Sequence, residues 1–145
     1  MRSLGRTVPT LVLVIVVCAI GAGAAWAQQP AGDKLAVEAS NAWLLLVDEG
    51  KYGESWEAAA SLFRGAVTKE NWIKLVEGTR KPLGKLVSRT FAMSRRMTSV
   101  PAAPDGQYIT VRYKTVFENK AEAVETVTPM LDKDGKWRVS GYYIR

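Results

Sequence analysis

Residues 72–98, WIKLVEGTRKPLGKLVSRTFAMSRRMT, decide the fold, because the spacing of the apolar residues changes within this stretch. Before Pro82 they recur every third or fourth position, as on one face of a helix. After Gly84 they recur every second position, which predicts a strand over residues 85–98. The strand face that we expect to be buried carries Val87, Arg89, Phe91 and Met93.

Upstream of this change, the helical spacing occurs three times, over residues 33–47, 52–67 and 68–83. Thr68 is a suitable N-cap for the third helix, and Pro82 with Gly84 ends it.

Downstream, alternating patterns predict three more strands, over residues 107–119, 122–131 and 136–145. The last two are joined by Asp132-Lys-Asp-Gly135, a typical hairpin turn. Helices followed by strands favour an α+β domain with an antiparallel sheet. We expect three N-terminal helices packed on a curved four-stranded antiparallel sheet, forming a single domain over residues 28–145.

The N-terminal residues 1–27 have the three parts of a secretory signal peptide. Arg2 and Arg6 precede an apolar run over residues 11–20, and Ala25-Trp-Ala27 fits the small-x-small cleavage rule. We therefore expect cleavage before Gln28 and a periplasmic or secreted protein. The alternative is an uncleaved anchor, because the uncharged stretch 8–27 is long enough to span a bilayer.

Composition excludes several kinds of chemistry. The chain contains no histidine, and its one cysteine, Cys18, lies in the predicted signal peptide. Histidine-dependent triads, histidine-bound zinc and histidine-bound haem are therefore excluded, and we expect no metal, cofactor or disulfide. The net charge is +6, but no lysine- or arginine-rich block carries it, so nucleic acid is not an expected partner.

Arg89 is the residue most suggestive of a site, because it falls on a strand face that is otherwise apolar. A buried charge needs a partner, and Glu125 holds a similar position on another strand. The pair either orients a polar or anionic ligand at the mouth of a cavity or forms a structural salt bridge. The candidate ligand-binding residues are Arg89, Glu125, Trp43, Trp56, Tyr113 and Tyr143, although the aromatic ones also suit a core.

Asp48 closes the first predicted helix, at an end where the helix dipole disfavours a negative charge. In an apolar cavity it could act as a general base. The plainer interpretation is a surface or turn hydrogen bond to residues 50–52.

Several motifs stand out in combination, among them Trp43-Leu-Leu-Leu-Val-Asp48, Gly50-Lys-Tyr52, Trp72, Arg80-Lys-Pro-Leu-Gly84, Pro104-Asp-Gly106, Phe117-Glu-Asn-Lys120, Asp134-Gly-Lys-Trp137 and Gly141-Tyr-Tyr-Ile144. Together they resemble a family of exported bacterial proteins, domain of unknown function 4019. The resemblance covers the mature chain but implies no activity, because the family has none assigned. The order of elements also looks like the cystatin-like or nuclear-transport-factor-2-like fold, by analogy only.

From these observations we expect a non-catalytic exported domain that binds a small molecule or an envelope protein. One alternative is a small isomerase- or lyase-like enzyme with a carboxylate and tyrosine site. Another is a structural domain that self-associates through the outer face of its sheet; the sequence leaves the oligomeric state open.

Overall fold

The structure is a computed structural model that describes residues 31–145. The predicted signal peptide, residues 1–27, lies outside the described residues. The helical half comprises α1 (Ala31–Asp48), α2 (Tyr52–Glu57), α3 (Ser61–Ala66), α4 (Lys69–Arg80) and the short 3-10 helix η1 (Lys81–Leu83). The strands are β1 (Leu86–Met97), β2 (Tyr108–Phe117), β3 (Lys120–Leu131) and β4 (Trp137–Ile144).

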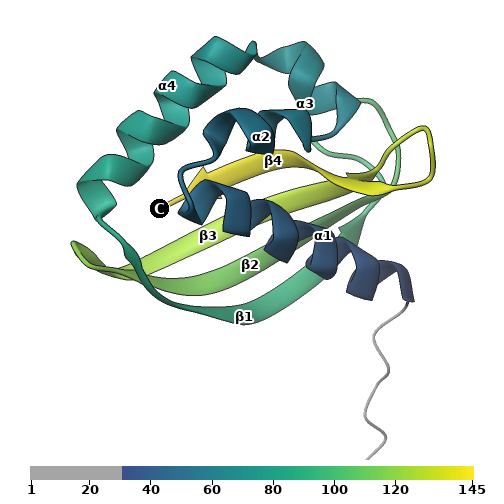
Figure 1. The fold of residues 1–145 in the computed structure, drawn as a ribbon. Coiled ribbons are helices and arrows are strands. Elements are labelled where there is room, and N and C mark those ends of the chain that lie inside the picture. The colour runs from purple at the N-terminus through teal and green to yellow at the C-terminus, as the bar shows by residue number, and fades with distance from the viewer. Residues whose placement is uncertain (1–30) are drawn as a thin grey trace, which may run out of the picture.

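The four strands form one antiparallel sheet in the order β1-β2-β3-β4, and the helices lie on one side of it (Figure 1). The α+β class and the four-stranded antiparallel sheet are thus confirmed. The change of spacing at residues 82–84 marks the junction correctly, because η1, which follows α4 directly, ends at Leu83 and β1 begins at Leu86. None of the helices within residues 31–145 is long and apolar enough to cross a membrane.

The prediction of three helices is wrong in the second segment, which forms α2 and α3 in place of one helix, so the structure has four α-helices over residues 31–80. The break lies at Ala60, whose backbone is extended (φ −61°, ψ 154°). Its N–H donates to the Val139 carbonyl of β4 at 2.8 Å. A bond to the sheet thus replaces a bond within a helix, and the tertiary contact overrides the high helix propensity of alanine.

The core lies between α1 and the inner face of the sheet. Trp43, Leu44 and Val47 of α1 are at most 3% exposed. They belong to one buried cluster with residues of the three strands beyond β1, namely Ile109, Val111, Tyr113, Val127 and Val139. Trp72 of α4 extends this cluster away from α1. Its ring packs edge-on against the ring of Phe63 in α3, with 4.9 Å between the ring centres.

The predicted buried face of β1 is only partly correct. Arg89 pairs with Thr115 and Phe91 with Tyr113, but the register then shifts, so that Met93 pairs with exposed Arg112. A second shift lies at Val87. Each bulge moves the following side chains to the opposite face. Val87 and Met93 are therefore not buried and are 63% and 44% exposed. Phe91 stays paired with Tyr113 but is still 45% exposed, so the predicted burial of these three apolar residues is wrong.

A similar shift in β4 corrects the placement of Tyr143. Thr128 pairs with Gly141, but Pro129 pairs with Val139, so the regular alternation is interrupted at Ser140. As a result Tyr142, beside Val127, belongs to the inner face. Tyr143 lies on the opposite face and is 56% exposed.

The β3–β4 turn is tied to α3 through Asp132. This buried carboxylate accepts hydrogen bonds from the Ser61 N–H (3.0 Å) and the Ser61 hydroxyl (2.7 Å). The residue before Ser61 is Ala60, which offers no side-chain cap, so Asp132 caps α3 from a distant turn. The Ser61 bonds, with that from the Lys133 N–H, lower the pKa of Asp132 to about 2.

Replacing Asp132 with alanine should destabilise the domain by about 1–2 kcal/mol at neutral pH, from loss of the cap and the bound carboxylate. The pKa of Asp132 in the folded protein lies below the ordinary aspartate value of 3.8, which applies to the unfolded chain. The contribution of Asp132 to the free energy of unfolding is therefore complete above about pH 4 and is lost as the pH falls toward about 2. Urea denaturation at several pH values should show the difference from wild type shrinking over that window. Asp105→Ala, in an exposed turn, is the control and should show no such difference.

Candidate functional site

A network of charged and hydroxyl side chains joins the C-terminal ends of α1 and α4 to the inner face of the sheet. We call it the two-arginine network; it consists of Asp48, Arg80, Arg89, Thr115, Glu125 and Tyr142. Its two carboxylates and two guanidinium groups balance in formal charge. Every member is at most partly exposed, so the network lies inside the domain and not on its surface.

Arg89 is the centre of the network because it uses both edges of its guanidinium group. Nε and Nη2 donate to the two oxygens of Glu125, the latter at 3.1 Å. Nη1 and Nη2 donate to the two oxygens of Asp48 at 2.6 and 2.9 Å. Burial alone would lower the pKa of Arg89, but the hydrogen bonds to both carboxylates hold it above its usual value. The predicted pairing of Arg89 with Glu125 is thus present, and Asp48 is an additional partner.

Glu125 is completely buried, and its charge is fully accommodated by its neighbours. Besides Arg89, the Thr115 hydroxyl donates to Oε2 at 3.0 Å and the Tyr142 hydroxyl donates to Oε1 at 2.7 Å. Burial, and then the negative charge of Glu125, raise the pKa of Tyr142. Tyr142 is therefore a neutral hydrogen-bond donor and not a base.

Asp48 occupies a different place from the surface turn that the sequence favoured. Its side chain is 13% exposed and pairs with Arg89 and with Arg80, whose Nη2 lies 2.8 Å from Asp48 Oδ1. The two arginines offset the unfavourable position of a carboxylate at a helix C-terminus. The turn interpretation is wrong because the side-chain oxygens bond to Arg89 of β1 and Arg80 of α4 and not to residues 50–52.

Arg80 is the incompletely bonded member of the network. It is 6% exposed and donates to Asp48 through Nη2. Its guanidinium carbon lies 4.9 Å from the centre of the Phe117 ring, so that ring covers one face of the group. Nε and Nη1 are buried and have no hydrogen-bond partner. Such buried donors are rare in folded proteins and point to a missing partner.

A cleft of about 460 Å³ lies against Arg80 and Asp48. Its other walls come from η1, the start of β1 and the β2–β3 turn, and they include Lys81, Lys85 and Glu118. Gly84 forms the bend between η1 and β1 with φ of 73°, and a Cβ there would lie 2.8 Å from a Glu118 oxygen. Glycine is therefore required for the chain to pass so close to Glu118.

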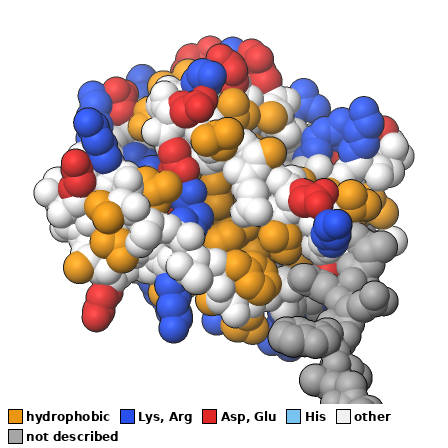
Figure 2. Space-filling view, turned by 60° about the horizontal axis from the view of Figure 1, so that its bottom comes forward, with side chains coloured by type: hydrophobic (Ala, Val, Ile, Leu, Met, Phe, Trp, Pro, Cys, Tyr) orange, Lys and Arg blue, Asp and Glu red, His pale blue; other side chains and the backbone are white. Residues whose placement is uncertain are grey.

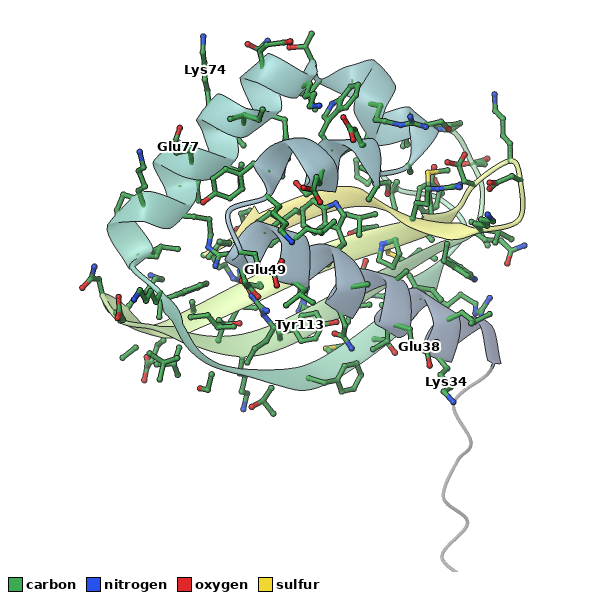
Figure 3. All side chains as sticks on the ribbon, in the orientation of Figure 1. Lys34, Glu38, Glu49, Lys74, Glu77 and Tyr113 are labelled. Carbon is green, nitrogen blue, oxygen red and sulfur yellow. The ribbon has the colours of Figure 1, made fainter. Side chains whose placement is uncertain are left out.

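The remaining predicted site residues lie away from this cleft. Trp43 is 3% exposed, and its indole N–H donates to the Ser55 carbonyl at 2.8 Å. Trp56 is half-buried and donates to the Val67 carbonyl at 2.8 Å. Tyr113 extends from β2 toward α1, where its hydroxyl donates to Asn41 at 2.7 Å (Figure 3). Burial raises the pKa of Tyr113 to about 12. With the outward-facing Tyr143, none of these aromatic residues lines the cleft.

The signals for Arg80, Thr115 and Tyr142 in the sequence are weaker. Thr115 stands among Val111, Tyr113 and Phe117 on one strand face, and a lone hydroxyl there suggests a buried polar partner. Arg80 resembled an ordinary cation in the last turn of a helix. Tyr142 was hidden by the irregularity in β4. Within residues 31–145, no three acidic, cysteine or histidine side chains gather closely enough to hold a metal ion.

Apolar side chains also reach the surface beside β1. Figure 2 shows hydrophobic and charged side chains intermixed on the face that is turned forward there. Leu45 of α1 and Phe91 of β1 are 56% and 45% exposed. Charged groups interrupt this surface, which gives it no single chemical character.

Comparison with known proteins assigns the chain to a family. Neither the curated proteins nor the solved structures include a significant match, so the likeness to the cystatin-like fold stays a prediction. A family profile described as "Protein of unknown function (DUF4019)" matches residues 39–142. This range includes every member of the two-arginine network and covers most of the chain. The chain therefore belongs to the DUF4019 family, as its motifs indicated.

Proposed function

We propose that the mature chain, residues 28–145, is an exported, non-catalytic domain of the bacterial envelope that binds a small ligand in the cleft beside Arg80. The observation that carries this proposal is the pair of buried, unpartnered donors on Arg80. Leaving one such donor without a partner costs about 1–3 kcal/mol. A cleft of about 460 Å³ next to them is within the size range of small-molecule sites.

The geometry favours binding over acid–base catalysis. Asp48 and Glu125 both accept charge-assisted hydrogen bonds from arginine, and these bonds occupy both oxygens of each carboxylate. A general base must be free to take a proton from a substrate. Glu125 is completely buried, and the pKa of Tyr142 is raised. The isomerase or lyase alternative therefore has no residue in this network that is suited to it.

Self-association through the outer face of the sheet has little support. Arg112 and Lys114 are exposed on that face of β2, and Thr126 and Thr128 alternate with the buried residues of β3. Stable interfaces between copies of a chain are usually depleted in charge at their centre. We therefore favour a small ligand in the cleft over pairing of sheets.

The proposal can be tested on protein purified from the envelope fraction of cells that express the full chain. Denaturing mass spectrometry should show a chain that begins at Gln28, and native mass spectrometry should show an added small mass that is lost on unfolding. A chain that begins at Met1 in the membrane fraction would support the anchor instead. Native spectra that contain only the bare polypeptide, or a copurified protein in place of a small mass, would contradict the small-ligand proposal.

A further inference from the structure

The walls of the cleft include three cations, Arg80, Lys81 and Lys85, and two carboxylates, Asp48 and Glu118. Lys81 is already paired with Glu77 at 2.7 Å. Asp48 is already shared between two arginines, with Arg80 and Arg89 both donating to Oδ1 at 2.8 and 2.9 Å. Glu118 lies across from Gly84 and accepts the Lys85 backbone N–H at 2.8 Å. Across residues 31–145, the ammonium group of Lys85 has no carboxylate within 4.0 Å. An exposed lysine and a buried arginine thus face the same opening.

The bonding of the two arginines differs in a way that matters for a ligand. Arg89 uses both edges of its guanidinium group on carboxylates of the protein itself. Arg80 has one carboxylate contact, and its Nε and Nη1 remain unpartnered. The N–H bonds of a guanidinium lie in its plane, so further hydrogen-bond partners must approach Arg80 near that plane, and the Phe117 ring covers one face of the group. Planar recognition of this kind suits carboxylate and phosphate oxygens.

We infer that the ligand is a small oxyanion, a carboxylate or a phosphate, held by Nε and Nη1 of Arg80 and by the ammonium group of Lys85. This inference rests on the proposed function and adds the chemical class of the ligand. Asp48 is then a positioning residue, since its bond to Nη2 fixes the orientation of Arg80. An oxyanion would accept hydrogen bonds from the buried donors of Arg80 and would also pair with the charge of Lys85. A neutral polyol could accept the hydrogen bonds but could not pair with that charge.

The test is calorimetric titration of the exported chain with acetate, succinate, inorganic phosphate and uncharged erythritol at constant ionic strength. We expect saturable binding of at least one anion and none of erythritol. Arg80→Gln should weaken that binding by more than about tenfold, because hydrogen bonds to a charged group are lost. Lys85→Gln should weaken it by about two- to fivefold, as expected for an exposed charge pair.

Lys74→Gln is the matched control, because Lys74 is exposed on α4 and points away from the cleft (Figure 3). Lys85→Gln keeps the test valid if Arg80→Gln fails to fold, since Lys85 is exposed and its backbone bond to Glu118 is retained. Equal anion affinities in the Lys85 and Lys74 variants would overturn the inference. If an uncharged molecule is retained from the envelope and no anion binds, the inference that the ligand is an oxyanion is wrong, but the proposed small-ligand function is supported. If no molecule is retained and no anion binds, both the oxyanion inference and the proposed function are wrong.

Discussion

Replacing Arg89 with leucine should lower the free energy of unfolding by about 3–5 kcal/mol, the usual cost of removing one partner of a buried ion pair. The change leaves Glu125, which has no solvent exposure, with only the hydroxyl groups of Thr115 and Tyr142. It also removes two of the three arginine contacts to Asp48. A loss of this size is a large part of the roughly 5–15 kcal/mol that stabilises a typical domain.

Urea denaturation followed by tryptophan fluorescence measures this loss. Arg95→Leu is the control, because Arg95 lies on the same strand, is exposed and forms no ion pair among the described residues. It should change the free energy of unfolding by less than about 0.5 kcal/mol. Adding Glu125→Gln to Arg89→Leu should recover part of the loss, because the buried charge is then removed. A loss below about 1 kcal/mol in the single variant would mean that solvent reaches Glu125.

Trp43→Ala is the second change with a large expected effect, again about 3–5 kcal/mol in the free energy of unfolding. The side chain is 3% exposed, and its ring packs against Trp72 at 5.7 Å and Tyr142 at 5.2 Å. The substitution also removes the indole N–H, so the Ser55 carbonyl loses the hydrogen bond that it accepts from Trp43. Alanine therefore creates a cavity and breaks a buried hydrogen bond in the same place.

Thermal and urea unfolding of Trp43→Ala separate the two interpretations that the sequence left open for this aromatic residue. A core residue lowers stability whether or not a ligand is present, whereas a ligand-lining residue mainly lowers affinity. Leu45→Ala is the control on the same helix, because Leu45 is 56% exposed and should change stability by less than about 0.5 kcal/mol. Unchanged stability in Trp43→Ala would place this tryptophan outside the core.

The fold was largely predictable because hydrophobic spacing is a local property. The switch at residues 82–84 and the four strands follow from it. The division of the second helix did not, because it depends on a hydrogen bond between Ala60 and Val139, residues far apart in the sequence. The bulges at Val87 and near Ser140 could not be predicted either, because an extra residue in one strand is recognised only from the register with the neighbouring strand.

The site was predictable only where a charge interrupted an apolar strand pattern. Arg89 and Glu125 stood out for this reason, and their pairing followed from the cost of burying either alone. Asp48 and Arg80 lie at helix ends, where charged residues are common, so their burial depends on how the helices meet the sheet. The cleft has the same origin, because its walls come from segments that only the tertiary fold brings together.

The position of Arg89 has a consequence for how the domain opens. It lies on an edge strand, which in most sheets is the first to detach. Here the Arg89 side chain forms ion pairs with Asp48 of α1 and with Glu125 of β3, although β2 lies between β1 and β3 in the sheet. Peeling β1 away would therefore break both ion pairs at once and leave the buried Glu125 without its cation, so amide hydrogen exchange in the middle of β1 should follow unfolding of the whole domain.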